Sequence, residues 1–348
     1  MNHDQTIESA LIALNRVISK SRVHFYKPIQ VAEILYRDRV HQDIDLNDLE
    51  SYRIKSKSWR DDISRILVGR CSTSSAKFQD NLFEENALPP SLIRLLGIRN
   101  KQTSGGVEKH IYAKFEEKYS DLSSALDYAI TRRDNFSLDQ FLELFKRQLG
   151  LRRSLDKVYE IVVYALFTSL IDALGVEISV DIKDKDSFLL FEFSEFANKI
   201  LGESFSHTQQ KYPAKLFRVG VTNAADRGLD MWGNFGLAIQ IKHLTISTEV
   251  AEDIAESISA DRIVIVCKDA EEELIYSVLS QIGWRSRIQA IITFSELTSW
   301  YDKAIKGKYS NILCDKVLSN LAEQIELEFP SIARNDRFHN FLLKRGYR

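Results

Sequence analysis

The sequence predicts a mixed α/β protein in which an all-helical N-terminal domain precedes a central mixed sheet flanked by helices. Up to about residue 150, apolar residues recur at helical spacing, whereas beyond about residue 215 short apolar runs alternate with amphipathic stretches. A length of 348 residues suits two domains, and the polar segment 100–106 is the best linker. We therefore expect a helical domain over 1–105 and a second domain over 106–348 that ends in a helical tail.

Composition excludes several classes of protein. The chain has 47 Lys and Arg against 49 Asp and Glu, a net charge of −2, so it is not a uniformly basic protein, although a local basic patch can still bind phosphate. No apolar run is long enough to span a membrane, and the first residues lack the pattern of a secretory signal. Three widely spaced cysteines predict neither a disulfide framework nor a thiolate zinc site. We expect a protein of the reducing cytoplasm without membrane contact.

The N-terminal domain is expected to consist of short helices. One apolar stripe at helical spacing runs through residues 7–18. Pro28 lies where a second helix can begin, and 46–52 is a third candidate. A fourth helix is expected over 54–70 and carries most of the positive charge of this region.

This fourth helix is the candidate for DNA recognition. Within 51–70, six Lys or Arg stand against two Asp, which gives a local charge of +4. Trp59, Ile63 and Ile66 fall on one face, so the opposite face presents basic and polar groups, as a helix-turn-helix recognition helix does in the major groove. The DNA-binding candidates on it are Lys55, Lys57, Arg60 and Ser64. A solvated basic face without a DNA contact is an equally good interpretation.

A long apolar helix is expected in the middle of the chain. The helices predicted here cover 108–118, 121–133, 137–149 and the stretch 154–175, which Gly175 ends. The last is apolar nearly all round, which is typical of a helix buried within a domain. It contains the carboxylate of Glu160, which is costly to bury unless it is paired or ligates a metal ion. Pairing with Lys157 at the edge of the helix is the alternative.

The second half of the chain predicts the sheet. Strands are expected over 215–222, 228–232, 237–246, 261–268 and 287–294. Helices are expected over 247–259, 270–283 and 295–305, and a basic helical segment over 311–348. The second and third strands form a hairpin around Gly233 and Asn234. Continuous apolar strands such as 261–268 are typical of a sheet covered on both faces.

An acid, an amide and an ammonium group are expected to meet at the end of this hairpin. Residues two apart share a face of a strand, so Gln240 and Lys242 point to the same side, and Asp230 can meet them across the turn. Mg2+ prefers oxygen ligands and keeps several waters, so the Asp230 carboxylate, the Gln240 side-chain oxygen and a substrate phosphate can hold it. Lys242 would lie beside the nucleophile and stabilise developing charge.

Glu160 is a fourth element of this site, because its helix precedes the sheet in the order expected for a helix beside the hairpin. The candidate catalytic residues are therefore Asp230, Gln240, Lys242 and Glu160, of which Asp230, Gln240 and Glu160 are the candidate metal ligands. Asp226 is a reserve ligand, and His243, which faces away from Lys242, is expected to be structural. Alone, the spacing of the hairpin residues is a weak signal, since an Asp at a turn and a polar face are common in hairpins.

Together, these elements resemble the PD-(D/E)XK nuclease superfamily. Gln240 stands where most members have a second acid, a form that occurs in Mrr-like restriction endonucleases, and the number of metal ions is left open. The segment 222–244, with 47–65 upstream, more closely resembles HaeII-like type II restriction endonucleases. That resemblance covers most of the chain.

The resemblance implies a PD-(D/E)XK core and a Mg2+-dependent endonuclease, with Mn2+ as a substitute, that cuts double-stranded DNA at a specific sequence. HaeII-like enzymes are associated with the palindrome purine-GCGC-pyrimidine. The resemblance further implies a homodimer, with one site for each strand of the palindrome, and a companion DNA methyltransferase that protects host DNA. Arg227, within the resembling segment, joins the expected DNA contacts.

Two alternatives stay open. An Mrr-like nuclease would act on modified DNA, which digestion of methylated and unmethylated DNA distinguishes. A DNA-binding regulator would keep the fold without catalysis, and the missing acid at Gln240 favours it. Binding without cleavage in Mg2+ or Mn2+ would identify such a regulator.

Overall fold

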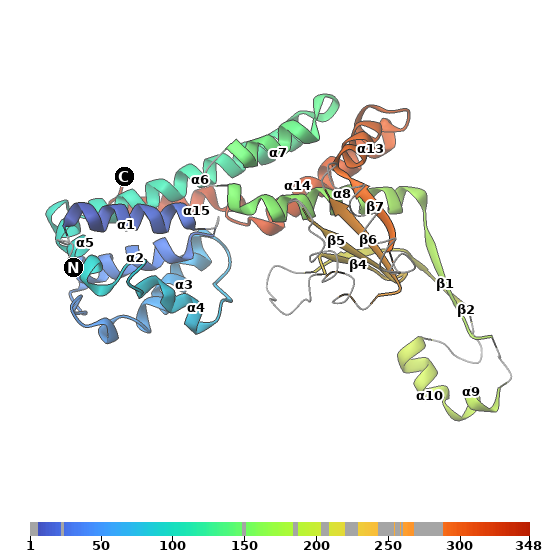
Figure 1. The fold of residues 1–348 in the computed structure, drawn as a ribbon, viewed down its shortest axis with the longest axis horizontal. Helices are drawn as coiled ribbons and strands as arrows, with labels where there is room; N and C mark the ends of the chain where they lie inside the picture. The colour runs from blue at the N-terminus through green and yellow to red at the C-terminus, as the bar shows by residue number, and fades with distance from the viewer. Residues whose placement is uncertain are drawn as a thin grey trace, which may run out of the picture. The chain divides into compact units, whose positions relative to one another are not determined.

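The structure is a computed structural model that describes residues 6–21, 24–147, 151–183, 187–202, 209–219, 229–242, 254, 258, 260–267 and 288–348. Contacts divide the chain into two compact units (Figure 1). We call Met1–Val158 with Leu321–Arg348 the helical unit, and Tyr159–Asn320 the sheet unit. Across the described residues, no helix is both long and apolar enough to cross a membrane.

The helical unit consists of helices, most of which pack around one buried apolar cluster. Its helices are α1 (Ile7–Lys20), α2 (Tyr26–Tyr36), α3 (Lys55–Leu67), α4 (Ala76–Asp80), α5 (Pro90–Gln102), α6 (Gly106–Thr131), α7 (Leu138–Arg147) and α15 (Asn335–Lys344), with the start of α8 (Leu155–Leu174) and the end of α14 (Ser310–Glu328). Short turns of helix lie at Arg37–His41, Leu49–Ser51, Asn81–Phe83, Arg133–Asn135, Arg152–Ser154 and Ile332–Arg334. The stripe predicted for α1 is confirmed at Leu14 and Ile18, which are buried, whereas Ile7 and Leu11 are partly buried and Ala10 is buried as well.

The helices expected over 108–118 and 121–133 are one continuous helix, α6, because no Gly or Pro interrupts the sequence between them. The predicted linker 100–106 comprises the end of α5, a tight turn at 103–105 and the first residue of α6. Gly105 adopts a φ of +88° there, which favours glycine, and the Asn100 side chain accepts hydrogen bonds from the first amides of α6.

The chain passes from the helical unit to the sheet unit after position 158 and returns to the helical unit at position 321, whereas the predicted division fell after position 105. One core explains why the chain does not divide at 105. Val107, Ile111 and Phe115 of α6 belong to the same buried cluster as Leu14 of α1 and Phe338 of α15. The reading and cutting roles expected of the two parts stay predictions.

The sheet unit contains the predicted mixed sheet. Its strands are β3 (Leu216–Arg218), β4 (Met231–Gly233), β5 (Leu237–Ile241), β6 (Arg262–Cys267) and β7 (Ile288–Thr293), in the order β3-β4-β5-β6-β7. The first three are antiparallel and the last three are parallel. The helix predicted over 295–305 is present as α13 (Phe294–Lys306). Most of the helix predicted over 247–259 and all of the helix predicted over 270–283 lie outside the described residues.

Helix α8 packs beside this sheet. The Tyr164 hydroxyl donates to the carbonyl oxygen of Leu216 in β3 at 3.3 Å. The Tyr301 hydroxyl of α13 donates to the carbonyl oxygen of Val162 at 2.7 Å, and burial raises the pKa of this tyrosine. The prediction of a buried central helix is therefore confirmed for residues 158–166.

A second, two-stranded sheet was not predicted. β1 (Glu177–Asp181) pairs antiparallel with β2 (Gln209–Pro213), and between them lie α9 (Phe188–Glu192), α10 (Ser194–Phe196) and the turn Ala197–Leu201. Figure 1 shows β1 and β2 as one long ribbon with α9 and α10 at its end. We call residues 177–213 the arm. Its mixed apolar and charged pattern has neither a clear helical nor a clear strand period.

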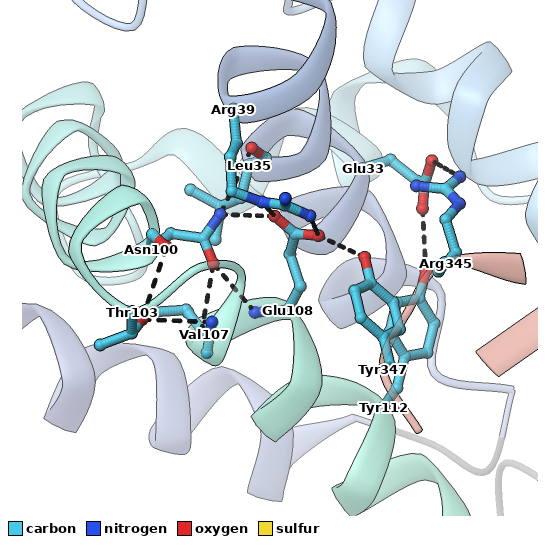
Figure 2. Close-up of polar contacts among 11 residues, drawn as sticks. Glu33, Leu35, Arg39, Asn100, Thr103, Val107, Glu108, Tyr112, Arg345 and Tyr347 are labelled. Atoms are coloured by element: carbon cyan, nitrogen blue, oxygen red, sulfur yellow. Dashed lines mark hydrogen bonds and ion pairs between the residues drawn. The ribbon is translucent and has the colours of Figure 1, made fainter. Parts of the chain in front are cut away.

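Two buried carboxylates hold the C-terminal residues in the helical unit (Figure 2). Glu108 on α6 accepts two hydrogen bonds of 2.9 Å from the Arg39 guanidinium and further ones from Asn100 and the Tyr347 hydroxyl. The hydrogen bonds of Arg39 to Glu108 raise the pKa of its guanidinium. Charge-assisted, bidentate contacts of this kind offset the cost of burying Glu108.

Glu33 on α2 is the second of these carboxylates. It accepts from the Tyr112 hydroxyl at 2.9 Å and from the Arg345 guanidinium at 2.8 Å (Figure 2). Burial raises the pKa of the Glu33 carboxyl, and the charge of Arg345 opposes that shift. Arg345 and Tyr347 therefore join the end of the chain to α2 and α6, which is why residues 335–348 belong to the helical unit.

The substitution Glu108→Ala tests this network. It leaves the buried part of Arg39, with Asn100, without the acceptor, so we expect a loss of about 3–5 kcal/mol in the free energy of unfolding, measured by urea denaturation. The control is Glu117→Ala on the same helix, because Glu117 pairs with Lys114 at 2.7 Å on the surface. The control should lose less than about 1 kcal/mol. Equal losses in the two variants would contradict the role of Glu108.

Candidate active site

The hairpin of β4 and β5 positions the candidate site. Asn234, Phe235 and Gly236 form its turn, where Gly236 has a φ of +79°. Met231 lies opposite Ile239 in the antiparallel register, so Asp230 lies across from Gln240. The Asp230 backbone is fixed on both sides, because its N–H donates to Ile239 at 3.2 Å and its carbonyl oxygen accepts from Val219 at 2.9 Å.

The structure brings the side chains of Asp230 and Gln240 into contact. The Gln240 amide Nε2 donates to Oδ2 of Asp230 at 2.8 Å, and the backbone N–H of Ile241 donates to the same oxygen at 2.7 Å. Two donors on one oxygen fix the direction of the carboxylate. The Ile241 amide could not be foreseen from residue types, because any residue at that position supplies it.

The other end of the Gln240 amide is the unusual feature. Gln240 is 2% exposed, and its Oε1 atom has no hydrogen-bond partner among the described residues. A buried carbonyl oxygen without a partner is costly and rare in native proteins. An oxygen ligand to a hard cation such as Mg2+ or Ca2+ would satisfy it, and the neighbouring carboxylate would add the negative charge that such a cation prefers. The donor set therefore fits a divalent metal ion.

Lys242 follows β5 directly, and its backbone N–H continues the pairing by donating to Val266 of β6 at 2.9 Å. Strand-like pairing keeps the side chain of Lys242 on the same side as that of Gln240, two residues earlier. Its side chain is partly exposed. An ammonium group thus lies at the same end of the hairpin as Asp230 and Gln240, as the sequence predicts.

Glu160 lies in α8 and is buried. Tyr164, one turn later on the same helix face, bonds to Leu216 of β3, the strand that pairs with β4. The face of α8 that carries Glu160 therefore lies on the β3 side of the sheet. Among the residues that the structure describes, no three His, Cys, Asp or Glu side chains are grouped to hold a metal ion.

The predicted orientation of the basic helix is wrong. α3 buries Ser56, Arg60, Ile63, Ser64 and Leu67, whereas Ile66, expected in the core, is 41% exposed. The Arg60 guanidinium is satisfied inside the unit by Asp61 at 2.7 Å, Gln79 at 3.0 Å and Gln30 at 3.3 Å. Apolar patterning cannot reveal an arginine whose partners come from other helices.

The remaining DNA-binding candidates differ in their surroundings. Lys55 is exposed at the start of α3, and Lys57 pairs with Asp80 at 2.6 Å. Arg227, with the reserve ligand Asp226 and the expected structural residue His243, lies outside the described residues.

An aromatic pair beside the hairpin was missed at the sequence level. The rings of Phe217 in β3 and Trp232 in β4 stack with centroids 4.5 Å apart, and both side chains are exposed. Trp232 shares a strand face with Asp230, two residues before it. Strand alternation was the one available signal: neighbouring residues of a strand point to opposite faces, so Trp232 points away from Met231 and Gly233, which the structure shows to be buried.

The substitution Gln240→Glu tests the donor set. Glutamate removes the Nε2 donor and places a second buried carboxylate against Asp230, so the two charges repel unless a cation lies between them. In chelator we expect a loss of about 2 kcal/mol in the free energy of unfolding, most of it regained on addition of Mg2+. Urea denaturation with and without Mg2+ measures both. The control is Gln289→Glu, on the exposed side of β7, whose free energy of unfolding should change neither in chelator nor on addition of Mg2+. A Gln240→Glu protein that is as stable as wild type in chelator would refute the arrangement.

Comparisons with known proteins agree with the resemblance of residues 222–244 and 47–65. The family model for the HaeII restriction endonuclease matches residues 10–347. The type II restriction enzyme HaeII of Haemophilus aegyptius is 54% identical over 342 residues, which is 98% of this chain and 97% of that protein. The type II restriction enzyme NgoBI of Neisseria gonorrhoeae is 53% identical over 341 residues, again 98% and 97% of the two chains. No solved structure matches. The chain therefore belongs to the HaeII restriction endonuclease family, and with it to the type II restriction enzymes.

Proposed function

We propose that the sheet unit is a PD-(D/E)XK nuclease core that cuts double-stranded DNA with Mg2+, for which Mn2+ can substitute. Type II restriction endonucleases generally use a divalent metal ion. The observation that carries the proposal is the buried Oε1 of Gln240, which no described residue satisfies, beside the fixed carboxylate of Asp230.

The order of elements supports the same core. Helix α8, with Glu160, precedes the antiparallel strands β3, β4 and β5, and the parallel strands β6 and β7 follow. This is the arrangement that the resemblance to the superfamily implies. All three candidate ligands belong to the sheet unit, although they lie far apart in sequence.

In the proposed mechanism, Asp230, Gln240 and Glu160 would hold the metal ion. When bound, the ion supplies a Lewis acid that polarises the scissile phosphate and lowers the pKa of a bound water. The chain's own residues orient the reaction: Gln240 Nε2 and the Ile241 amide hold the Asp230 carboxylate in one direction. The Lys242 ammonium would stabilise the charge that develops on the phosphate oxygens and position the attacking water.

The proposed substrate is a GCGC-containing palindrome, as in the resemblance to HaeII-like enzymes. A palindrome has a two-fold axis, and a homodimer with one active hairpin for each strand matches it. An enzyme that cuts such sites in cytoplasmic DNA requires that host copies be protected, so we include a companion DNA methyltransferase among its partners. Identity above 50% to two type II restriction enzymes favours this function over the Mrr-like and inactive alternatives.

For DNA contact we propose the N-terminal part of α3. Lys55 is exposed there and Lys57 lies nearby, and both suit phosphate contacts. Arg60 and Ser64 are buried in the helical unit, so we place them as supports of α3 rather than on its outer surface. Arg227, three positions before Asp230 in the sequence, remains a proposed DNA contact.

The substitutions Asp230→Ala and Lys242→Ala test the active site. Each removes a group needed for hydrolysis but not for holding DNA, so we expect cleavage to fall by a factor of about 100 or more, with DNA binding largely kept. The assay is digestion of one sequenced plasmid in Mg2+, with a chelator lane, followed by mapping of the ends. The controls Asp302→Ala and Lys303→Ala change the same residue types on the exposed face of α13 and should cut normally. Full activity of either hairpin variant, or wild-type binding without cleavage in Mg2+ and Mn2+, would refute the proposal.

A second prediction concerns α3. Lys55→Ala should weaken DNA binding to all sequences and reduce the salt slope of log K by about 1, because one phosphate contact is lost. Lys109→Ala, an exposed lysine on α6, is the control and should keep the wild-type slope. Binding titrations at several salt concentrations measure the slope. An unchanged slope for Lys55→Ala would place the DNA elsewhere on the protein.

A further inference from the structure

The arm carries an apolar surface at its end. Phe188 is 93% exposed and Phe191 is 70% exposed, and Phe193, Phe196, Leu189 and Ile200 are each more than half exposed. So many large apolar side chains exposed within one short segment are unusual on a monomeric protein, and large exposed apolar surfaces usually mark an interaction site. Within 188–201 the one described residue that is buried is Ala197.

The two strands of the arm give a second reason to expect an interaction partner. In the part of the chain that the structure describes, β1 and β2 pair with each other and with no third strand, and four of the five residues of β1 are exposed. A two-stranded ribbon on its own is marginally stable in water. An arm of this construction gains its stability from a surface that covers its apolar end.

Charge excludes a polyanionic occupant. Residues 177–213 contain seven Asp or Glu against four Lys or Arg, a local charge of −3. Lys199, the one lysine of the apolar segment 187–202, is already paired with Glu195. DNA and anionic lipid would both be repelled, whereas an apolar protein surface would not.

The size of the surface matches a dimer interface. With about 200 Å² for a whole phenylalanine side chain, the exposed parts of these four phenylalanines and two aliphatic side chains amount to about 800 Å². A standard stable interface buries about 800 Å² on each partner. The exposed apolar area of one arm therefore equals the area that one copy of a protein buries in a standard dimer interface.

The root of the arm is bonded to the catalytic hairpin. Asn234, in the β4–β5 turn, donates to the Pro213 carbonyl oxygen at 3.1 Å and accepts from the Lys215 N–H at 2.8 Å. The Ala214 N–H donates to Val176 at 2.8 Å, which closes the base of the ribbon. A contact made by the arm is thus coupled through a few bonds to the turn that aligns Asp230 with Gln240.

From these observations we propose that the apolar end of the arm, residues 188–201, binds a second copy of this chain and forms the dimer interface. The inference rests on the proposed function, because two copies are required where both strands of a palindrome are cut. A two-fold interface is self-complementary, so each arm contacts the partner through the same surface. Coupling at Asn234 would then set the distance between the two hairpins.

The test is the double substitution Phe188→Glu and Leu189→Glu. Both side chains are exposed in the single chain, so folding should be unaffected, as checked by circular dichroism and thermal unfolding. In the proposed dimer they are buried, and two charges there should raise the dimer dissociation constant by about a hundredfold or more. Sedimentation equilibrium should shift from twice the chain mass to once. On a supercoiled one-site plasmid, nicked circles should accumulate in place of linear DNA.

Two further variants sharpen the result. Ile312→Glu places the same charge on an exposed apolar position of α14, outside the arm, and should stay dimeric. Ile200→Glu, on the turn after α10, repeats the test if the double variant does not fold. A wild-type monomer, or arm variants that remain dimeric, would overturn the inference, including the case in which they remain dimeric but lose DNA binding. A wild-type dimer that depends on the arm but does not cut DNA would overturn the proposed function and leave the arm interface standing.

Discussion

The antiparallel pairing of β4 with β5 is the constraint on which the candidate site depends. It places Asp230 across from Gln240, and it does so only in one register. A slip of one residue would turn Gln240 to the opposite face of the sheet and separate the amide from the carboxylate. The turn at Gly236, the bond from Val219 to Asp230 and the parallel neighbour β6 all maintain that register. The candidate site therefore requires the correct strand register as well as the correct residue types.

The protein buries polar groups in two different ways, and the difference distinguishes groups that stabilise the fold from groups of the candidate site. In the helical unit, Glu33 and Glu108 are surrounded by donors from several helices and from the end of the chain. Such satisfied networks specify packing. At the hairpin, the Nε2 end of the Gln240 amide is satisfied, whereas its Oε1 has no hydrogen-bond partner among the described residues. An unsatisfied acceptor in a native core needs an explanation, and a ligand to a cation is the one that the neighbouring carboxylate supports.

A net charge of −2 conceals a division of surfaces. The segment 51–70 is basic, although part of that charge is neutralised inside the helical unit by Asp61 and Asp80. The arm is acidic and apolar at its end. Surfaces of opposite character suit opposite partners, DNA for one and protein for the other. Whole-chain composition averages these surfaces and so reveals neither.

The sequence by itself determined the mixed sheet, the buried helix α8 and the meeting of Asp230 with Gln240, because these follow from periods of two and 3.6 residues over short distances. It could not determine the outward face of α3, the joining of residues 335–348 to the helical unit, or the arm. Each of those depends on partners distant in sequence, such as Gln79 for Arg60 and Glu33 for Arg345. Only the tertiary structure showed that the Gln240 oxygen is buried and has no partner within the described part of the chain, since burial and hydrogen bonding are properties of the packed chain and not of local pattern.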